Sequence, residues 1–123
     1  MKILEQITKF AGVGAIGTGI HYVILITLVE ALSVNIVVST SLGAIAGGVV
    51  NYWLNHRFTF SSSASHAKAS IKYAIVVSAG FLINGIIMAV GVRYVDVNYV
   101  LIQVVATAVV FIWNFVCSRY WVF

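Results

Sequence analysis

The chain has 123 residues, of which 62% are hydrophobic and 8% are charged; it contains no proline and carries a formal net charge of +4. A soluble domain of this size is about half apolar and roughly a quarter charged, so the composition excludes a soluble globule. The apolar excess predicts a protein whose surface is covered by lipid.

Four apolar runs follow in chain order, at about residues 10–32, 35–55, 71–93 and 98–118. Each is near the roughly 20 residues that a helix needs to cross a bilayer, and none alternates apolar with polar residues as barrel strands do. Asn35 and Asn98 stand at the start of the second and fourth runs, where an asparagine can cap exposed backbone N–H groups. We predict an all-α membrane protein with one transmembrane domain over residues 1–123 and four helices arranged as two hairpins.

The charges predict the orientation of these helices. Only Arg93 falls on one side, and the other basic residues fall on the opposite side: Lys2, Lys9, Arg57, Lys68, Lys72 and Arg119. The positive-inside rule then places both termini and the central loop in the cytoplasm, in a multi-pass protein of the inner membrane. The loop "SSSASHAKAS", residues 61–70, is predicted to be a flexible aqueous connector. Topology and anionic headgroups account for the positive charge, so no nucleic-acid partner is expected.

The two halves of the sequence correspond at a shift of 63 residues. "NYWLNHRFTF" (51–60) and "NFVCSRYWVF" (114–123) both open with Asn and close with Phe. The same shift superimposes Lys9 on Lys72, Gly17 on Gly80, Asn35 on Asn98 and Asn51 on Asn114. These matches predict a parallel internal repeat, with two hairpins related by an axis along the membrane normal.

Small and polar residues recur at every fourth position in the first two helices. Helix 35–55 carries Ser39, Gly43, Gly47, Asn51 and Asn55, and helix 10–32 carries Ala11, Ala15 and Gly19. Small residues at this spacing allow close helix packing, within the bundle or between protomers. The asparagine amides are different, because each needs hydrogen-bond partners near the membrane boundary.

Polar side chains also lie near the middle of the spans. His21 and Asn84 correspond to each other in the repeat, and Gln103 and Thr107 add polarity to the last helix. Such residues either bond to a neighbouring helix or line a polar pathway. Both interpretations stay open, and the equivalent depth of His21 and Asn84 favours the pathway.

Motifs for chemistry are missing from the sequence. It contains no G-x-x-x-x-G-K-[ST] nucleotide-binding motif, no nucleophile–base or carboxylate pair and no His/Cys metal cluster. We therefore expect no enzymatic activity, no catalytic residue, no cofactor and no metal site.

The chain resembles the GtrA-like family of small four-span membrane proteins over essentially its whole length. The matching segments are "KFAGVG" (9–14), Asn51–Phe60 and the C-terminal "NFVCSRYWVF". The resemblance implies movement of a polyprenyl-phosphate-linked sugar, such as undecaprenyl-phosphate-glucose, from the inner to the outer leaflet for cell-surface polysaccharide or O-antigen modification. Where the family has Arg directly after the second Asn, this chain has His56, followed by Arg57.

With such a lipid as substrate, the doubled endings are predicted to build a phosphate site at the cytoplasmic face. An Arg fork matches phosphate oxygens well, and lysines at the same level can complete a basic ring. The predicted phosphate-binding residues are Arg57, Arg119, Lys9, Lys72 and His56. The predicted sugar-binding or pathway residues are Asn51, Asn114, Asn55, His21, Asn84 and Gln103.

Two other functions stay open. The first is a non-catalytic subunit that anchors a membrane glycosyltransferase. The second is an exporter of the small multidrug resistance type, which is disfavoured because its only candidate acid, Glu30, lies at the outer end of the first helix. We also expect a homo-oligomer, a dimer, since four helices barely enclose a cavity for a sugar.

Overall fold

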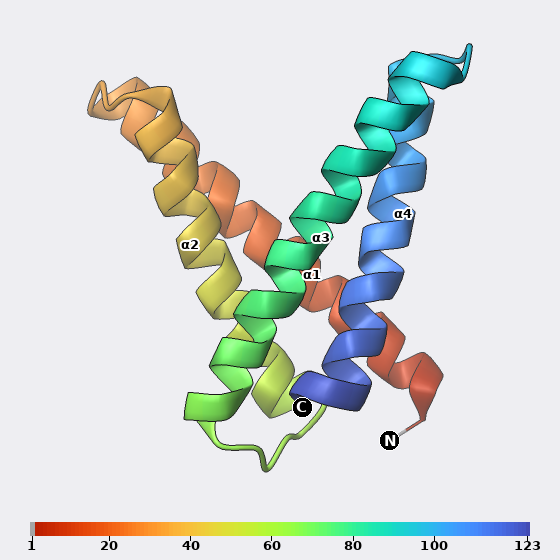
Figure 1. The fold of residues 1–123 in the computed structure, drawn as a ribbon. Coiled ribbons are helices and arrows are strands. Elements are labelled where there is room, and N and C mark those ends of the chain that lie inside the picture. The colour runs from red at the N-terminus through yellow and green to blue at the C-terminus, as the bar shows by residue number, and fades with distance from the viewer. Residues whose placement is uncertain (1) are drawn as a thin grey trace. The chain divides into compact units, whose positions relative to one another are not determined.

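A computed structural model describes residues 2–123, which form long helices joined by short loops and contain no strand (Figure 1). The helices are α1 (Ile3–Ile26), α2 (Ile36–Leu54), α3 (His66–Tyr94) and α4 (Tyr99–Cys117). π-type turns continue three of them, namely η1 (Thr27–Ala31), η2 (Asn55–Thr59) and η3 (Ser118–Val122). Including these turns, the helical segments are 29, 24, 29 and 24 residues long and apolar enough to cross a membrane. The chain is therefore a multi-pass membrane protein, as its composition predicts.

The chain divides into two compact units, Met1–Ser62 and Ser63–Phe123. In the first unit α2 packs along α1, and in the second unit α4 packs along α3. We call these units the first hairpin and the second hairpin. Each holds one pair of consecutive helices, as the sequence predicts.

Two helices begin earlier than the hydropathy indicates. α1 begins at Ile3 instead of residue 10, and α3 begins at His66 instead of residue 71. The second half of the predicted flexible connector is therefore helical. Ser65 caps this start, because its hydroxyl accepts a hydrogen bond from the Lys68 backbone N–H at 3.3 Å. Ala69, in the first turns of α3, is fully buried, so packing also holds this polar segment in the helix.

Asparagine caps begin α2 and α4, as predicted. The Asn35 Oδ1 accepts hydrogen bonds from the N–H groups of Val37 at 2.8 Å and Val38 at 3.3 Å. The Asn98 Oδ1 accepts a bond from the Val100 N–H at 2.8 Å. Each cap satisfies a backbone donor that would otherwise lack a partner at the helix start.

The doubled sequence endings share one backbone form. In η2 the Phe60 N–H donates to the Asn55 carbonyl, and in η3 the Phe123 N–H donates to the Ser118 carbonyl, both at 2.9 Å. These bonds join residues five apart, which widens the last turn relative to an α-helix. The widened turn starts at a buried residue in both cases, since Asn55 and Ser118 are almost completely enclosed.

The two hairpins pack their helices differently. In the first hairpin the backbones approach closely: a Cβ on Gly47 would lie 2.5 Å from the Gly17 carbonyl oxygen. In the second hairpin side chains fill the contact: Val76 of α3 and Ile102, Ala106 and Phe115 of α4 are buried, and Ile102 packs against Gly91 of α3. The small residues predicted on helix 35–55 thus face α1, whereas Ala11, Ala15 and Gly19 of α1 are exposed in the described structure and do not join this contact.

Candidate functional site

One polar contact crosses the first hairpin inside its apolar spans. The His21 Nε2 lies 3.0 Å from the Thr40 hydroxyl, which joins α1 to α2 by a partly buried hydrogen bond. His21 is a predicted pathway residue, and Thr40 is a partner that the sequence interpretation missed. The contact provides His21 with a polar neighbour in a region without water.

A corresponding contact crosses the second hairpin. The Gln103 side-chain amide donates to the Asn84 Oδ1 at 2.9 Å and to the Thr107 hydroxyl at 3.1 Å. Asn84 and Gln103 lie 63 residues after His21 and Thr40, so the two contacts occupy matching positions. The structure therefore brings Asn84 and Gln103 together, and Thr40 could have been found as the residue that the shift aligns with Gln103.

Two buried amide oxygens have no hydrogen-bond partner within residues 2–123. They are the Oδ1 atoms of Asn51 in α2 and Asn114 in α4, again 63 residues apart. Leaving a buried acceptor without a partner costs about 1–3 kcal/mol, so such groups are uncommon and call for an explanation. Two acceptors at matching positions in the spans are therefore available to a hydrogen-bond donor other than the described residues.

A glycine lies against each of these amides. A Cβ on Gly17 would overlap the Asn51 amide, and a Cβ on Gly80 would lie 3.1 Å from the Asn114 Oδ1. The missing side chains leave the amides room beside the facing helix. The sequence shows these glycines as a repeated pair, but it does not show that they face the asparagines.

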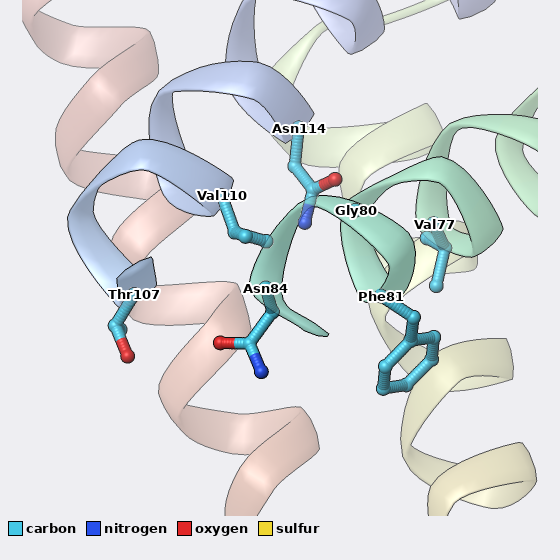
Figure 2. A pocket seen from close by; sticks show the side chains of 7 residues that line it. All are labelled: Val77, Gly80, Phe81, Asn84, Thr107, Val110 and Asn114. Carbon is cyan, nitrogen blue, oxygen red and sulfur yellow. The ribbon is translucent and has the colours of Figure 1, made fainter. Parts of the chain in front are cut away.

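The second hairpin contains a cleft of about 300 Å³ beside Asn114 (Figure 2). Side chains of α3 and α4 line it, namely Val77, Gly80, Phe81, Asn84, Thr107, Val110 and Asn114. Its walls are apolar, with a few polar groups among them, which is the usual make-up of a small-ligand site. Phe81 and Thr107 had no predicted part in binding.

The first ending turns His56 inward and Arg57 outward. His56 is buried and lies beside the Tyr52 ring, with 5.9 Å between ring centroids. Arg57 is exposed, and its guanidinium lies 5.6 Å from the ring centres of both Trp53 and Phe58. Asn55 is buried as well, and its Oδ1 accepts a bond from the Thr59 hydroxyl at 2.8 Å inside η2.

In the second ending, Arg119 is half-buried. Its Nη1 is enclosed and lacks a hydrogen-bond partner in the described part of the chain, and its guanidinium lies 5.3 Å from the Tyr120 ring centre. The shift of 63 residues aligns Arg119 with His56, not with Arg57. Arg119 therefore offers an enclosed cationic donor for an anion, and its counterpart in the first hairpin is a histidine.

The two predicted lysines make different contacts. Lys72 donates from Nζ to the Trp121 carbonyl at 3.3 Å and lies 5.3 Å from that indole ring centre, so it reaches the ending that contains Arg119. Lys9 forms an ion pair with Glu5 at 3.3 Å on the exposed surface of α1. The second hairpin thus has two cations at one end, while the charge of Lys9 is partly compensated.

The chain is a small multi-pass membrane protein. Its apolar spans contain polar contacts, and cations lie at the ends of the spans, so these groups can meet a polar or anionic ligand. The chain matches the GtrA/DPMS transmembrane domain over residues 9–123, and it belongs to that family. This result confirms the resemblance seen in the sequence. Comparison with curated proteins found no match. The family indicates a membrane protein of polyprenyl-phosphate-sugar processing.

Proposed function

We propose that the protein translocates a polyprenyl-phosphate-linked sugar, of the undecaprenyl-phosphate-glucose kind, from the inner to the outer leaflet of the cytoplasmic membrane. The observation that carries this proposal is the matched pair of buried acceptors, the Oδ1 atoms of Asn51 and Asn114, neither of which has a hydrogen-bond partner in residues 2–123. A hydroxyl-rich headgroup needs such groups, because an unsatisfied polar group in hydrocarbon costs several kcal/mol. The exported sugar would serve cell-surface polysaccharide or O-antigen modification.

In this proposal the phosphate binds at the ends of α2 and α4. Arg119 and Lys72 hold it in the second hairpin, since Arg119 has an enclosed donor without a partner and Lys72 reaches the same ending. His56, Arg57 and Lys9 form the corresponding, weaker end of the first hairpin. The sugar contacts the polar side chains of the spans, namely Asn51, Asn114, His21, Asn84 and Gln103.

We further infer that the hairpins are copies inserted in the same sense, with both termini in the cytoplasm. Contacts at matching positions support a repeat: Phe10 lies against Phe60 at 6.1 Å between ring centroids, and Tyr73 lies against Phe123 at 6.2 Å. The basic residues at one end of the spans support the orientation. The protein acts without chemistry of its own, as a homodimer, and it can work beside a membrane glycosyltransferase.

Reconstitution tests the proposal. The purified chain is placed in vesicles that carry undecaprenyl-phosphate-glucose in one leaflet, and the appearance of the sugar in the opposite leaflet is measured with a membrane-impermeant reagent. We expect movement that depends on the protein. No movement above empty vesicles would contradict translocation, and if the same preparation activated an added glycosyltransferase, it would indicate the anchoring role instead.

A further inference from the structure

We propose that the cleft of the second hairpin is the binding site for the sugar, and that it selects the neutral carbohydrate over the phosphate. This inference rests on the proposed function and names which part of the lipid binds where. The cleft lies between α3 and α4, and its volume of about 300 Å³ is at the lower end of ligand sites (Figure 2). That size suits one monosaccharide better than a longer oligosaccharide.

The polar groups of the cleft can both donate and accept, as sugar hydroxyls require. Gln103 donates to the oxygens of Asn84 and Thr107, so neither the Asn84 NH₂ group nor the Thr107 hydroxyl hydrogen is used in these bonds. The Asn114 Oδ1 is a buried acceptor without a partner in the described residues. A hydroxyl can donate to Asn114 while a second hydroxyl accepts from Asn84 or Thr107.

The same groups disfavour an anion. None of the residues that line the cleft is charged. A phosphate oxygen cannot donate to the Asn114 Oδ1, and no cation among the lining residues would offset the phosphate charge in a medium of low dielectric. The cleft is therefore suited to the uncharged part of the lipid.

The position of the cleft fits a sugar attached to a phosphate. Asn114 precedes Arg119 by five residues, which corresponds to about 7 Å along a helix. A phosphate held by Arg119 would thus lie about one and a half helical turns further along the chain than a sugar ring beside Asn114. The walls formed by Phe81, Val77 and Val110 supply apolar surface for the C–H face of the ring.

The matching place in the first hairpin lacks these features. The positions aligned with Phe81, Thr107 and Val110 are Thr18, Ala44 and Gly47. The Phe81 ring is replaced by the smaller Thr18 side chain, and the Thr107 hydroxyl is replaced by the methyl of Ala44. A Cβ on Gly43 would lie 2.6 Å from the His21 carbonyl oxygen, so the helices are in close backbone contact at this level. We therefore assign the site that selects the sugar to the second hairpin, and the polar residues of the first hairpin remain contacts along the path.

Two substitutions test the site without removing a charge. Thr107→Val keeps the shape and removes the hydroxyl, and Gly80→Ala places a methyl 3.1 Å from the Asn114 Oδ1 and 3.3 Å from the Val110 Cγ1. The purified full chain, in phosphatidylethanolamine–phosphatidylglycerol vesicles, is titrated with undecaprenyl-phosphate-glucose and separately with undecaprenyl phosphate. Binding is followed by tryptophan fluorescence.

The parent is expected to prefer the glucose-bearing lipid about fivefold, and each variant is expected to lose that preference while binding undecaprenyl phosphate unchanged. Two controls should keep the preference: Ala44→Val, aligned with Thr107 in the first hairpin, and Gly85→Ala, where a Cβ meets no atom within 4 Å.

Equal binding of both lipids by the parent overturns the sugar site, as does a preference that survives in folded Thr107→Val protein. The proposed function is judged separately by the leaflet assay. A preference that Thr107→Val abolishes supports the site even if the parent moves no lipid. If the protein translocates the lipid but the variants keep the preference for the glucose-bearing lipid, the sugar site is refuted. The proposed function then still stands.

Discussion

In the first hairpin the glycines of α2 meet the backbone of α1, and in the second hairpin Gly80 and Gly91 of α3 meet side chains of α4. Gly43 and Gly47 bring the α2 backbone against His21 and Gly17 of α1. At the level of Gly43, the second hairpin has Ala106 buried against α3. The closer approach leaves the first hairpin without the side-chain walls that form the cleft beside Asn114.

Despite this difference, the hairpins keep the same polar contacts. His21 with Thr40 corresponds to Asn84 with Gln103, and Asn51 beside Gly17 corresponds to Asn114 beside Gly80. The apolar packing thus differs between the hairpins while the polar positions are the same. Polar groups are constrained more strongly because each needs a partner of suitable geometry inside the membrane.

The largest expected effect concerns the glycine contact of the first hairpin. Gly47→Ala should destabilise the folded protein by about 1–3 kcal/mol, because its methyl would lie 2.5 Å from the Gly17 carbonyl oxygen and backbone cannot rotate away. Gly48→Ala, the next residue, is the matched control, since its Cβ meets no atom within 4 Å. Thermal unfolding in detergent measures both. Equal stability of the two variants would show that close backbone contact does not hold this hairpin together.

The next effect concerns the two endings. Arg119→Lys should weaken binding of undecaprenyl phosphate about tenfold, because a lysine ammonium cannot form the bidentate fork of a guanidinium. The Arg119 guanidinium is half-buried, and its Nη1 has no hydrogen-bond partner within residues 2–123. Arg57→Lys keeps the same charge and should change binding less than twofold, because Arg57 is exposed over Trp53 and Phe58.

Titration of vesicles that contain each variant measures this difference between the hairpins. A larger loss in Arg57→Lys than in Arg119→Lys would reverse the assignment of the principal phosphate ligand. Circular dichroism before the titration establishes that both variants remain helical.

The sequence predicts the fold well because hydropathy acts over whole segments. Four spans follow from run length alone, and Asn35 and Asn98 reveal two helix starts through a local capping rule. The start of α3 at His66 was not predictable from hydropathy, because Ser65 and Ala69 stabilise a polar segment through a cap and through burial.

The site could be predicted in part. The shift of 63 residues points to Asn51, Asn114, His21 and Asn84, which the structure then places at matching contacts. The burial of His56 and the exposure of Arg57, in contrast, depend on the widened turn η2. The sequence alone does not determine which residue of a π-type turn faces inward.

A smaller effect should separate the two polar contacts within the spans. Gln103→Leu removes two hydrogen bonds and leaves the Asn84 oxygen without its donor, whereas Thr40→Val removes one bond to His21. Single interhelical bonds in membranes average about 0.6 kcal/mol. Each substitution removes one such bond, and Gln103→Leu also removes the bond to Thr107 within α4, so we expect about 1 kcal/mol for Gln103→Leu and about half of that for Thr40→Val. Unfolding in mixed micelles measures both, and an equal or larger loss in Thr40→Val would contradict this order.

The smallest effect on stability is expected at Lys9. Lys9 pairs with Glu5 at 3.3 Å with both side chains about half exposed, and exposed pairs one helical turn apart contribute about 0.3–0.5 kcal/mol. Lys9→Gln should therefore change stability by no more than that. It should also leave phosphate-lipid binding nearly unchanged, because Glu5 already offsets the charge.

Lys72→Gln should weaken binding of the phosphate lipid about threefold, since Lys72 reaches the Trp121 carbonyl at the ending that holds Arg119. Raising the salt concentration should shrink the Lys9→Gln stability effect further, because screening acts most on exposed charges. Equal binding losses in both variants would mean that the two lysines act only as general attraction for anionic lipid, and that the second hairpin has no stronger phosphate end than the first.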